Sequence, residues 1–141
     1  MSGFDIQRFT ARGFGGHIGR LGLTYSDSGA DWVSLALPYA EDLVGDPETG
    51  VIASGPIVTM MDTATSLAVW VKLGRFQPQA TLDLRVDYLR PARPGRTVIG
   101  RGECVKITRS VAFVRGVAYD EGPDDPLAQV AGTFMLMSNW S

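Results

Sequence analysis

Cysteine and histidine are scarce in this chain, and their scarcity excludes several classes of protein. The 141 residues include one cysteine, Cys104, and one histidine, His17. A single thiol cannot build a disulfide framework, and the sequence contains no His, Cys and Asp grouping with the spacing of a metal site. We therefore expect no bound metal, a structural role for Cys104 in the core, and a reducing compartment such as the cytoplasm.

Runs of basic residues are also missing. The 13 Lys and Arg are matched by 15 Asp and Glu, which gives a formal net charge of -2. Nucleic-acid-binding proteins usually carry a basic patch or stripe, so a nucleic-acid partner is not expected. Eleven of the basic residues are Arg, a bias that suits phosphate binding but also follows from a GC-rich coding sequence.

Long uninterrupted apolar segments are absent as well. Residues 1–16 carry charges early and have no apolar core of a secretory signal, so we expect neither a leader nor an anchor. The most apolar stretch, residues 53–73, contains charged residues and falls short of the roughly 20 uninterrupted apolar residues of a membrane span. The sequence predicts an N-terminal arm or short helix over residues 1–16, then a single domain over residues 17–141.

The apolar stretch predicts one long helix around which the chain is organised. Ser54 can cap the first turn, and Pro56 suits that turn because the N-H it lacks would be unpaired there. Gly74 is a typical residue at the end of a helix. Apolar side chains fall on every side of the helix, so other parts of the protein must wrap it.

Six segments have the composition or alternation of β-strands. They are residues 17–25 and 32–39 before the helix, and residues 80–88, 97–107, 111–119 and 127–137 after it. Residues 40–52 contain Gly45, Asp46, Pro47 and Gly50, which interrupt any regular element, and are predicted to form a loop. Strict alternation over 80–88 predicts that Leu82 and Leu84 share the inner face while Thr81 and Asp83 face outward.

Small residues alternate along the strands predicted over 97–107 and 111–119, which allows a bulky helix to approach their backbones closely. Together with the apolar helix, this pattern favours an α+β protein of the hotdog type. In that fold a curved antiparallel sheet is wrapped around one long central helix.

Three stretches carry a resemblance to a known family. They read GDPETGVIASGPIVTMMDTAT from Gly45, TLDLRVDYLRPARPG from Thr81 and VAGTFML from Val130. In order and spacing these stretches resemble the PaaI-type acyl-CoA thioesterases of the hotdog superfamily. The chain keeps the family's helical acid as Asp62, and the family's Gly-Gly pair falls on Ser54 and Gly55. Ala53 and Asp46 stand where the family has His and Asn.

The resemblance implies hydrolysis of an acyl-CoA thioester. Asp62 would act as general base on water or as nucleophile, and the amides of Ser54 and Gly55 would stabilise the oxyanion. Asp62 lies too far along the helix for a capping acid, and a lone carboxylate on an apolar helix is costly unless it is paired or hydrated. It could also bond to nearby Thr or Ser side chains, and Ser-Gly-Pro could be an ordinary helix start.

Two further residues are candidates for the same site. By resemblance Thr81 stands where some of these thioesterases hold a hydroxyl that positions water, although Thr is also common in strands for its β-propensity. Asp46 could enter the site beside Asp62 and split the acid and base roles with it. Asp-Pro is also a frequent turn, and the sequence favours that interpretation of Asp46.

The resemblance also implies the partners. Arg90, Arg93 and Arg109 lie at predicted turns that would meet the phosphates of CoA, although surface Arg is often simply solvated. CoA enters as part of the substrate, so no separate cofactor is expected. Copies of the chain are expected to pair into a homodimer or homotetramer, with each site between two helices.

Two alternatives use the same fold. The exchanged His and Asn positions are compatible with a catalytically weak acyl-CoA binding module. A hydratase-like protein is the weaker alternative, because such a site usually needs a histidine and His17 is predicted to be structural and far from the motif that contains Asp62.

Overall fold

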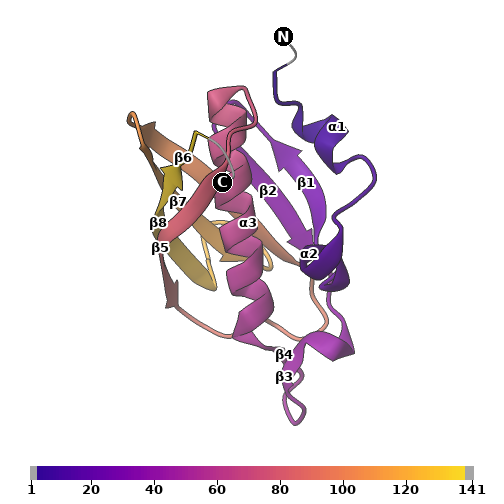
Figure 1. Cartoon of the computed structure of the whole chain (residues 1–141). Coiled ribbons are helices and arrows are strands. Elements are labelled where there is room, and N and C mark those ends of the chain that lie inside the picture. Colours follow the sequence, from indigo (N-terminus) through magenta and orange to yellow (C-terminus); the bar gives the residue numbers. More distant parts are fainter. Residues whose placement is uncertain (1–2, 139–141) are drawn as a thin grey trace.

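One long helix lies against a curved antiparallel sheet (Figure 1). The structure is a computed structural model and describes residues 3–138. The sheet has six strands in the order β1-β2-β6-β7-β8-β5. They are β1 (Thr24–Ser28), β2 (Trp32–Leu37), β5 (Gln79–Tyr88), β6 (Val98–Ile107), β7 (Val111–Tyr119) and β8 (Ala128–Leu136). The predicted α+β hotdog fold is confirmed.

The central helix, α3 (Ser54–Leu73), follows Ala53, whose backbone is extended and whose side chain cannot cap. Ser54 is already the first helical residue, so the prediction that its side chain caps the helix is wrong. The helix ends at Gly74, whose φ of 71° is left-handed and therefore favours glycine. No helix within residues 3–138 is long and apolar enough to cross a membrane.

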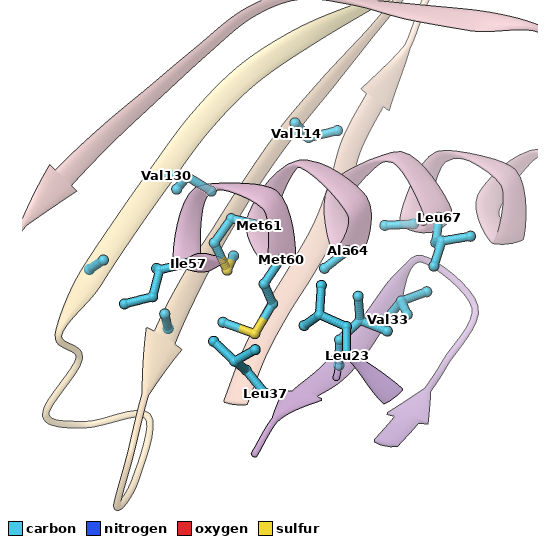
Figure 2. Packing of buried hydrophobic residues seen from close by; sticks show 14 of the residues in the cluster. Leu23, Val33, Leu37, Ile57, Met60, Met61, Ala64, Leu67, Val114 and Val130 are labelled. Carbon is cyan, nitrogen blue, oxygen red and sulfur yellow. The ribbon is translucent and has the colours of Figure 1, made fainter. Parts of the chain in front are cut away.

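The core lies between α3 and the sheet (Figure 2). A methyl group on Gly102 of β6 would lie 2.6 Å from the backbone nitrogen of Thr65, so only glycine lets the two backbones meet there. The predicted stripe of small residues is therefore confirmed. Cys104 is fully buried in this stripe, and burial raises the pKa of its thiol, as expected for a core residue.

One side of α3 remains uncovered by the sheet. We call it the open stripe; its residues are Gly55, Val58, Thr59, Asp62 and Ser66. Gly55 and Val58 are exposed, and the other three are half-buried. The expectation that α3 is wrapped on all sides is therefore wrong within a single chain. The only acid of the helix lies on the side that the rest of the chain leaves accessible.

β5 carries a bulge that changes which side chains face α3. Thr81 pairs with Phe134 and Asp83 with Thr133, so the register shifts between them and Leu82 is the additional residue. Leu82 is 54% exposed, whereas Leu84 packs against the core. The strict alternation predicted for this strand is wrong at the bulge, because the extra residue turns Thr81 toward the helix.

The short elements lie around the ends of α3. The predicted strand over 17–25 is wrong at its start: α2 (Gly16–Arg20) precedes β1, and Gly16 and Gly22 have left-handed backbones that favour a turn over a strand. The predicted loop over 40–52 contains a 3-10 turn (Glu41–Leu43) and a small hairpin. The hairpin strands are β3 (Val44–Asp46) and β4 (Val51–Ile52), and they lie below the start of α3 in Figure 1. The first helix is α1 (Ile6–Thr10).

Candidate functional site

Asp62 is held by a residue of the edge strand. The hydroxyl of Thr81 donates a hydrogen bond of 2.8 Å to Oδ1 of Asp62. The contact exists because the bulge in β5 directs Thr81 inward. Oδ2 of Asp62 has no hydrogen-bond partner among the described residues and lies on the open stripe. A carboxylate with one oxygen fixed and the other free is suited to accept a proton from water.

The start of α3 leaves backbone donors unpaired. No side chain caps the helix, and Ser54 and Gly55 are exposed. Their N-H groups, together with the helix dipole, favour a negative charge in front of the first turn. A methyl group on Gly55 would meet no heavy atom within 4 Å, so the space beside it is open. Gly55 and Asp62 are seven residues apart, which places them on the same side of α3 and roughly 10 Å apart along its axis.

Asp46 does not join Asp62 within the chain. Its carboxylate accepts hydrogen bonds from the backbone N-H of Glu48, at 3.1 Å, and from the hydroxyl of Thr49, at 2.8 Å. These bonds are those of an ordinary Asp turn at the tip of the β3–β4 hairpin. The structure therefore gives Asp46 a local structural role.

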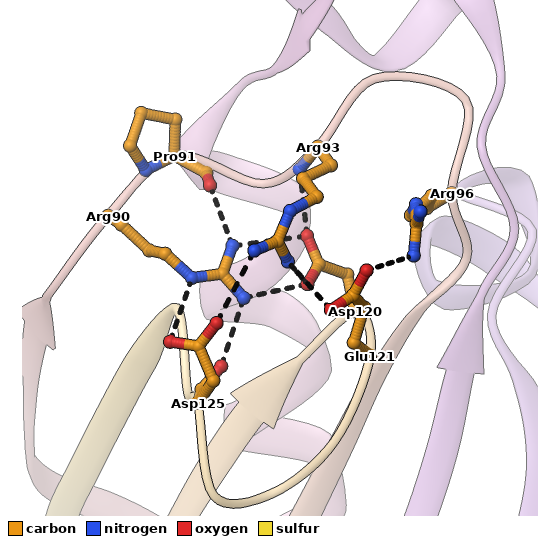
Figure 3. Close-up of polar contacts among 7 residues, drawn as sticks. All are labelled: Arg90, Pro91, Arg93, Arg96, Asp120, Glu121 and Asp125. Atoms are coloured by element: carbon orange, nitrogen blue, oxygen red, sulfur yellow. Dashed lines mark hydrogen bonds and ion pairs between the residues drawn. The ribbon is translucent and has the colours of Figure 1, made fainter.

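Arg90 is part of a network of ion pairs beyond the end of β5 (Figure 3). Its five guanidinium N-H donors are all used: two bind Asp120, two bind Asp125 and one binds the carbonyl of Pro91. The side chain of Asp120 is completely buried and also accepts hydrogen bonds from the backbone and side chain of Arg93. Hydrogen bonds from Arg90 hold the pKa of Asp120 well below its usual range, with Arg93 adding to the effect. No donor of Arg90 remains for a phosphate.

The other two predicted phosphate contacts lie at opposite ends of the sheet. Arg93 is 39% exposed and belongs to the network at the N-terminal end of α3. β6 runs alongside α3 in the same direction. Gly100, early in β6, lies against Met60, early in α3, and Val105, late in β6, accepts a hydrogen bond from Lys72, late in α3. Arg109 follows the end of β6 and therefore lies beyond the C-terminal end of α3. Arg93 and Arg109 cannot contact one phosphate within a single chain.

His17 lies closer to the helix than the sequence indicated. It belongs to α2, and its Nε2 is 3.3 Å from the hydroxyl of Thr59 on the open stripe. Because Thr59 is three residues before Asp62, the expectation that His17 is far from the site is wrong. The sequence missed this contact because residues 17–25 were assigned to a strand, and no local motif links α2 to the middle of α3.

Two other polar side chains of β5 contact α3 and were not predicted. Gln79 is buried and donates to the carbonyl of Ser66, at 2.9 Å, while its Oε1 has no partner among the described residues. Tyr88 donates to the carbonyl of Ser54, at 3.2 Å. Together with Thr81, they form a row of hydrogen bonds between β5 and α3. Within residues 3–138 no group of His, Cys, Asp and Glu is arranged to hold a metal ion.

Comparison with known proteins identifies the family. Residues 49–126 match the family model of the Thioesterase superfamily, which is more than half of the chain. The chain belongs to the thioesterase superfamily. The matched range includes both the start of α3 and the Asp62–Thr81 pair, so the open stripe lies inside the part of the chain that defines this superfamily.

Several proteins of known structure are similar to this chain over most of its length. A Pseudomonas aeruginosa protein of known crystal structure is 42% identical, covers 86% of this chain and 90% of its own, and has a TM-score of 0.78. The phenylacetic acid degradation protein PaaI of Thermus thermophilus is 26% identical over 85% of this chain and 97% of its own, with a TM-score of 0.74. These similarities agree with the predicted PaaI-type hotdog thioesterase.

A thioesterase from Haemophilus influenzae shares the fold at 22% identity, covering 98% of this chain and 96% of its own with a TM-score of 0.82. A Halobacterium salinarum protein provisionally named as an esterase is 38% identical over 81 residues, which is 55% of this chain. The chain spans about half, 54%, of the length of that curated relative. Thioester hydrolysis is therefore the general chemistry of the superfamily to which this chain belongs.

Proposed function

We propose that the protein hydrolyses an acyl-CoA thioester to a free acid and CoA. The observation that supports this most strongly is the Asp62–Thr81 hydrogen bond, which fixes one oxygen of a carboxylate on the open stripe. A structural acid would be expected to have both oxygens paired, or to be fully solvated. Here the second oxygen is available to a ligand while the first is held by a donor from another element.

In the proposed mechanism Asp62 removes a proton from a water molecule that attacks the thioester carbonyl. The acyl carbon gains the water oxygen, the carbon–sulfur bond breaks, and the proton passes from Asp62 to the departing CoA sulfur. Direct attack by Asp62 as nucleophile would give the same products through an anhydride that water then hydrolyses. Thr81 holds the carboxylate in one orientation in both versions.

The start of α3 would stabilise the negative charge that develops on the carbonyl oxygen. The free N-H groups of Ser54 and Gly55 provide two donors, and Pro56 has none to contribute. A spacing of roughly 10 Å between Gly55 and Asp62 leaves room for a carbonyl group and one water molecule between them. The amide of Gly55 therefore completes the proposed site at its N-terminal end.

The protein is proposed to act as a homodimer or homotetramer. β5 is an edge strand, and Leu82, Tyr88 and Leu89 around it are each about half exposed. An unpaired strand edge with apolar side chains favours pairing with a second copy. Such pairing would place another copy near the open stripe and enclose the site between two helices. Of the three arginines predicted to contact phosphates, Arg93 is the one that is partly exposed and lies near the N-terminal end of α3 with donors not fully used in the ion-pair network.

Thr81 provides a test of how Asp62 is held. We expect Thr81→Val to lower kcat about tenfold, because it removes a hydrogen bond to a charged group worth about 1.5 kcal/mol or more. Thr81→Ser keeps the hydroxyl and should retain most of the activity. Steady-state kinetics of the two variants would measure this, and equal kcat values for Val and Ser would contradict the assigned role.

Gly55 provides a test of the proposed oxyanion site. Gly55→Ala should fold normally and gain up to about 0.5 kcal/mol of stability, since the new methyl meets open space and alanine favours helix. The same methyl would obstruct the approaching carbonyl, so kcat/KM should fall at least about tenfold. Gly122→Ala is the matched control, because a methyl there also meets open space but lies in the turn between β7 and β8, outside α3. Unchanged activity of Gly55→Ala would exclude this amide from the site.

The function itself is tested with a panel of acyl-CoAs that carry short, long and aryl groups. Release of the free CoA thiol at a rate above the uncatalysed reaction is the expected result, and the preferred acyl group identifies the substrate class. An enoyl-CoA in the same panel tests the hydratase-like alternative. This test is included because His17, the kind of residue that a hydratase site needs, lies beside Thr59 on the open stripe. Loss of the enoyl absorbance without thiol release would favour that alternative.

The acyl-CoA binding module is the second candidate. It is supported by Ala53 and Asp46, which replace the family's His and Asn, and by the use of the Asp46 carboxylate within its own turn. Calorimetric binding of an acyl-CoA at micromolar affinity, with no thiol released over hours, would favour the module over the enzyme. A cytoplasmic location, proposed from the single buried thiol of Cys104, suits either candidate.

A further inference from the structure

Tyr88, the last residue of β5, contacts the first turn of α3. Its hydroxyl donates a hydrogen bond of 3.2 Å to the carbonyl oxygen of Ser54. That carbonyl and the N-H of Gly55 belong to the same peptide unit. Because a trans peptide is planar, its C=O and N-H point in opposite directions. A side chain that holds the oxygen of Ser54 therefore also sets the direction of the Gly55 N-H.

The first turn of α3 has little other support of this kind. No side chain caps the helix, Gly55 has the most flexible backbone of any residue type, and Pro56 has no backbone N-H to donate. Ala53, which precedes the turn, is anchored by a hydrogen bond from its N-H to the carbonyl of Leu43. Apart from the bonds of the helix itself, the Tyr88 hydroxyl is the contact that restrains the Ser54–Gly55 peptide among the described residues.

β5 thus contacts α3 at both functional positions. Thr81 near the start of the strand holds the carboxylate of Asp62, and Tyr88 at its end holds the carbonyl of Ser54. The two hydrogen bonds connect one strand to the proposed base and to the proposed oxyanion donor. Any shift of α3 along β5 would change both contacts together.

We propose that Tyr88 is a positioning residue that orients the Gly55 amide toward the thioester carbonyl. This inference rests on the proposed function, since it assigns a role to a residue outside the groups that touch the substrate. Partial burial raises the pKa of the Tyr88 phenol, so near pH 7 the hydroxyl is protonated and remains a donor. Phenylalanine at this position would preserve the packing of the ring but remove the one side-chain hydrogen bond that the Ser54 carbonyl has among the described residues, which would leave it only its bond within the helix.

The test compares Tyr88→Phe with Tyr25→Phe. Tyr25 loses a hydroxyl that contacts Ser28 within β1, at 2.7 Å, so it controls for removal of a phenol oxygen away from the site. We expect Tyr88→Phe to lower kcat about fivefold to tenfold with KM changed less than about twofold, since a donor moved by a fraction of an ångström loses transition-state stabilisation. Tyr25→Phe should leave both constants unchanged.

A spectroscopic measurement separates positioning from a general loss of structure. An acyl-CoA analogue in which CH₂ replaces the thioester sulfur cannot be hydrolysed but keeps the carbonyl. In the wild-type complex the infrared carbonyl band should lie below its frequency in water because of the hydrogen bond from Gly55, and Tyr88→Phe should move it back toward the solution value. Tyr25→Phe should leave the band where it is in the wild-type complex.

These measurements distinguish a wrong role for Tyr88 from a wrong proposed function. If Tyr88→Phe keeps the wild-type kcat and carbonyl band while Asp62→Asn is inactive, the inference about Tyr88 is wrong and the hydrolase remains. If the wild-type protein binds the analogue but hydrolyses nothing, the proposed function fails, and the carbonyl band alone decides the role of Tyr88. If the analogue does not bind to the wild-type protein, both proposals are wrong.

Discussion

Replacement of Asp62 by asparagine is expected to lower kcat by about a thousandfold, the usual effect of removing a general base. Asparagine has the same shape and keeps an oxygen that can accept the Thr81 hydroxyl, so the side chain should stay in place. It cannot take a proton from water or form an anhydride. The measurement is thiol release from the preferred acyl-CoA under saturating conditions.

KM or the calorimetric affinity of Asp62→Asn should remain within a few-fold of the wild-type value, because the substitution leaves the shape of the open stripe unchanged. Asp83→Asn is the matched control. Asp83 is an exposed acid just past the bulge in the same strand, and its replacement should leave kcat unchanged. A folded Asp62→Asn protein with full turnover on every acyl-CoA would exclude Asp62 as base and as nucleophile.

Replacement of Asp120 by asparagine is expected to lower the free energy of unfolding by about 2 kcal/mol, less than the cost of breaking a fully buried ion pair because both arginine partners are partly exposed. The carboxylate is completely buried and binds both Arg90 and Arg93, which are 20% and 39% exposed. Its removal takes away the one buried counter-ion that the two cations share, and among the described residues leaves them only the exposed acids Asp125 and Glu121. Urea unfolding at neutral pH measures the loss.

The same contact predicts how stability depends on pH. The pKa of Asp120 is lowered in the folded protein, mainly by Arg90, so the carboxylate stabilises the fold fully above its unfolded pKa of about 4. This contribution is progressively lost as the pH falls below that value. The difference in unfolding free energy between wild type and Asp120→Asn should therefore shrink at acid pH.

Asp87→Asn is the control for Asp120. Asp87 pairs with Arg85 on the surface, where both side chains are exposed, and such a pair is worth less than about 1 kcal/mol. Its loss should shift the urea midpoint only slightly at any pH. If Asp87→Asn and Asp120→Asn shift the urea midpoint equally, the buried Asp120 carboxylate contributes no more to stability than a surface ion pair does.

The fold could be predicted from the sequence because its main signals are local. The helix over Ser54–Leu73 follows from a run of apolar residues bounded by a Ser-Gly-Pro turn and Gly74. Small residues such as Gly102 indicate where the helix approaches the sheet. By contrast, the sequence predicts a strand where α2 lies, because a stretch of five residues with two glycines has no clear helical period.

The arrangement of the site was less predictable because it depends on pairings between distant residues. The bulge that turns Thr81 toward Asp62 is a register shift against β8, and the alternating sequence of β5 gives no sign of it. The use of every Arg90 donor requires Asp120, which is 30 positions away and directly follows β7. Asp62 itself was identifiable because an acid in the middle of an apolar helix stands out in the sequence alone.

The central claim is that water attacks an acyl-CoA carbonyl beside Asp62. The most direct test is turnover of the preferred acyl-CoA in H₂¹⁸O, with mass analysis of the released acid and of CoA. We predict one labelled oxygen in each molecule of acid and one free thiol for each acid over many turnovers, with both products lost in Asp62→Asn. Unlabelled, intact acyl-CoA recovered from the wild-type protein, or labelled acid formed equally fast by Asp62→Asn, would contradict the account.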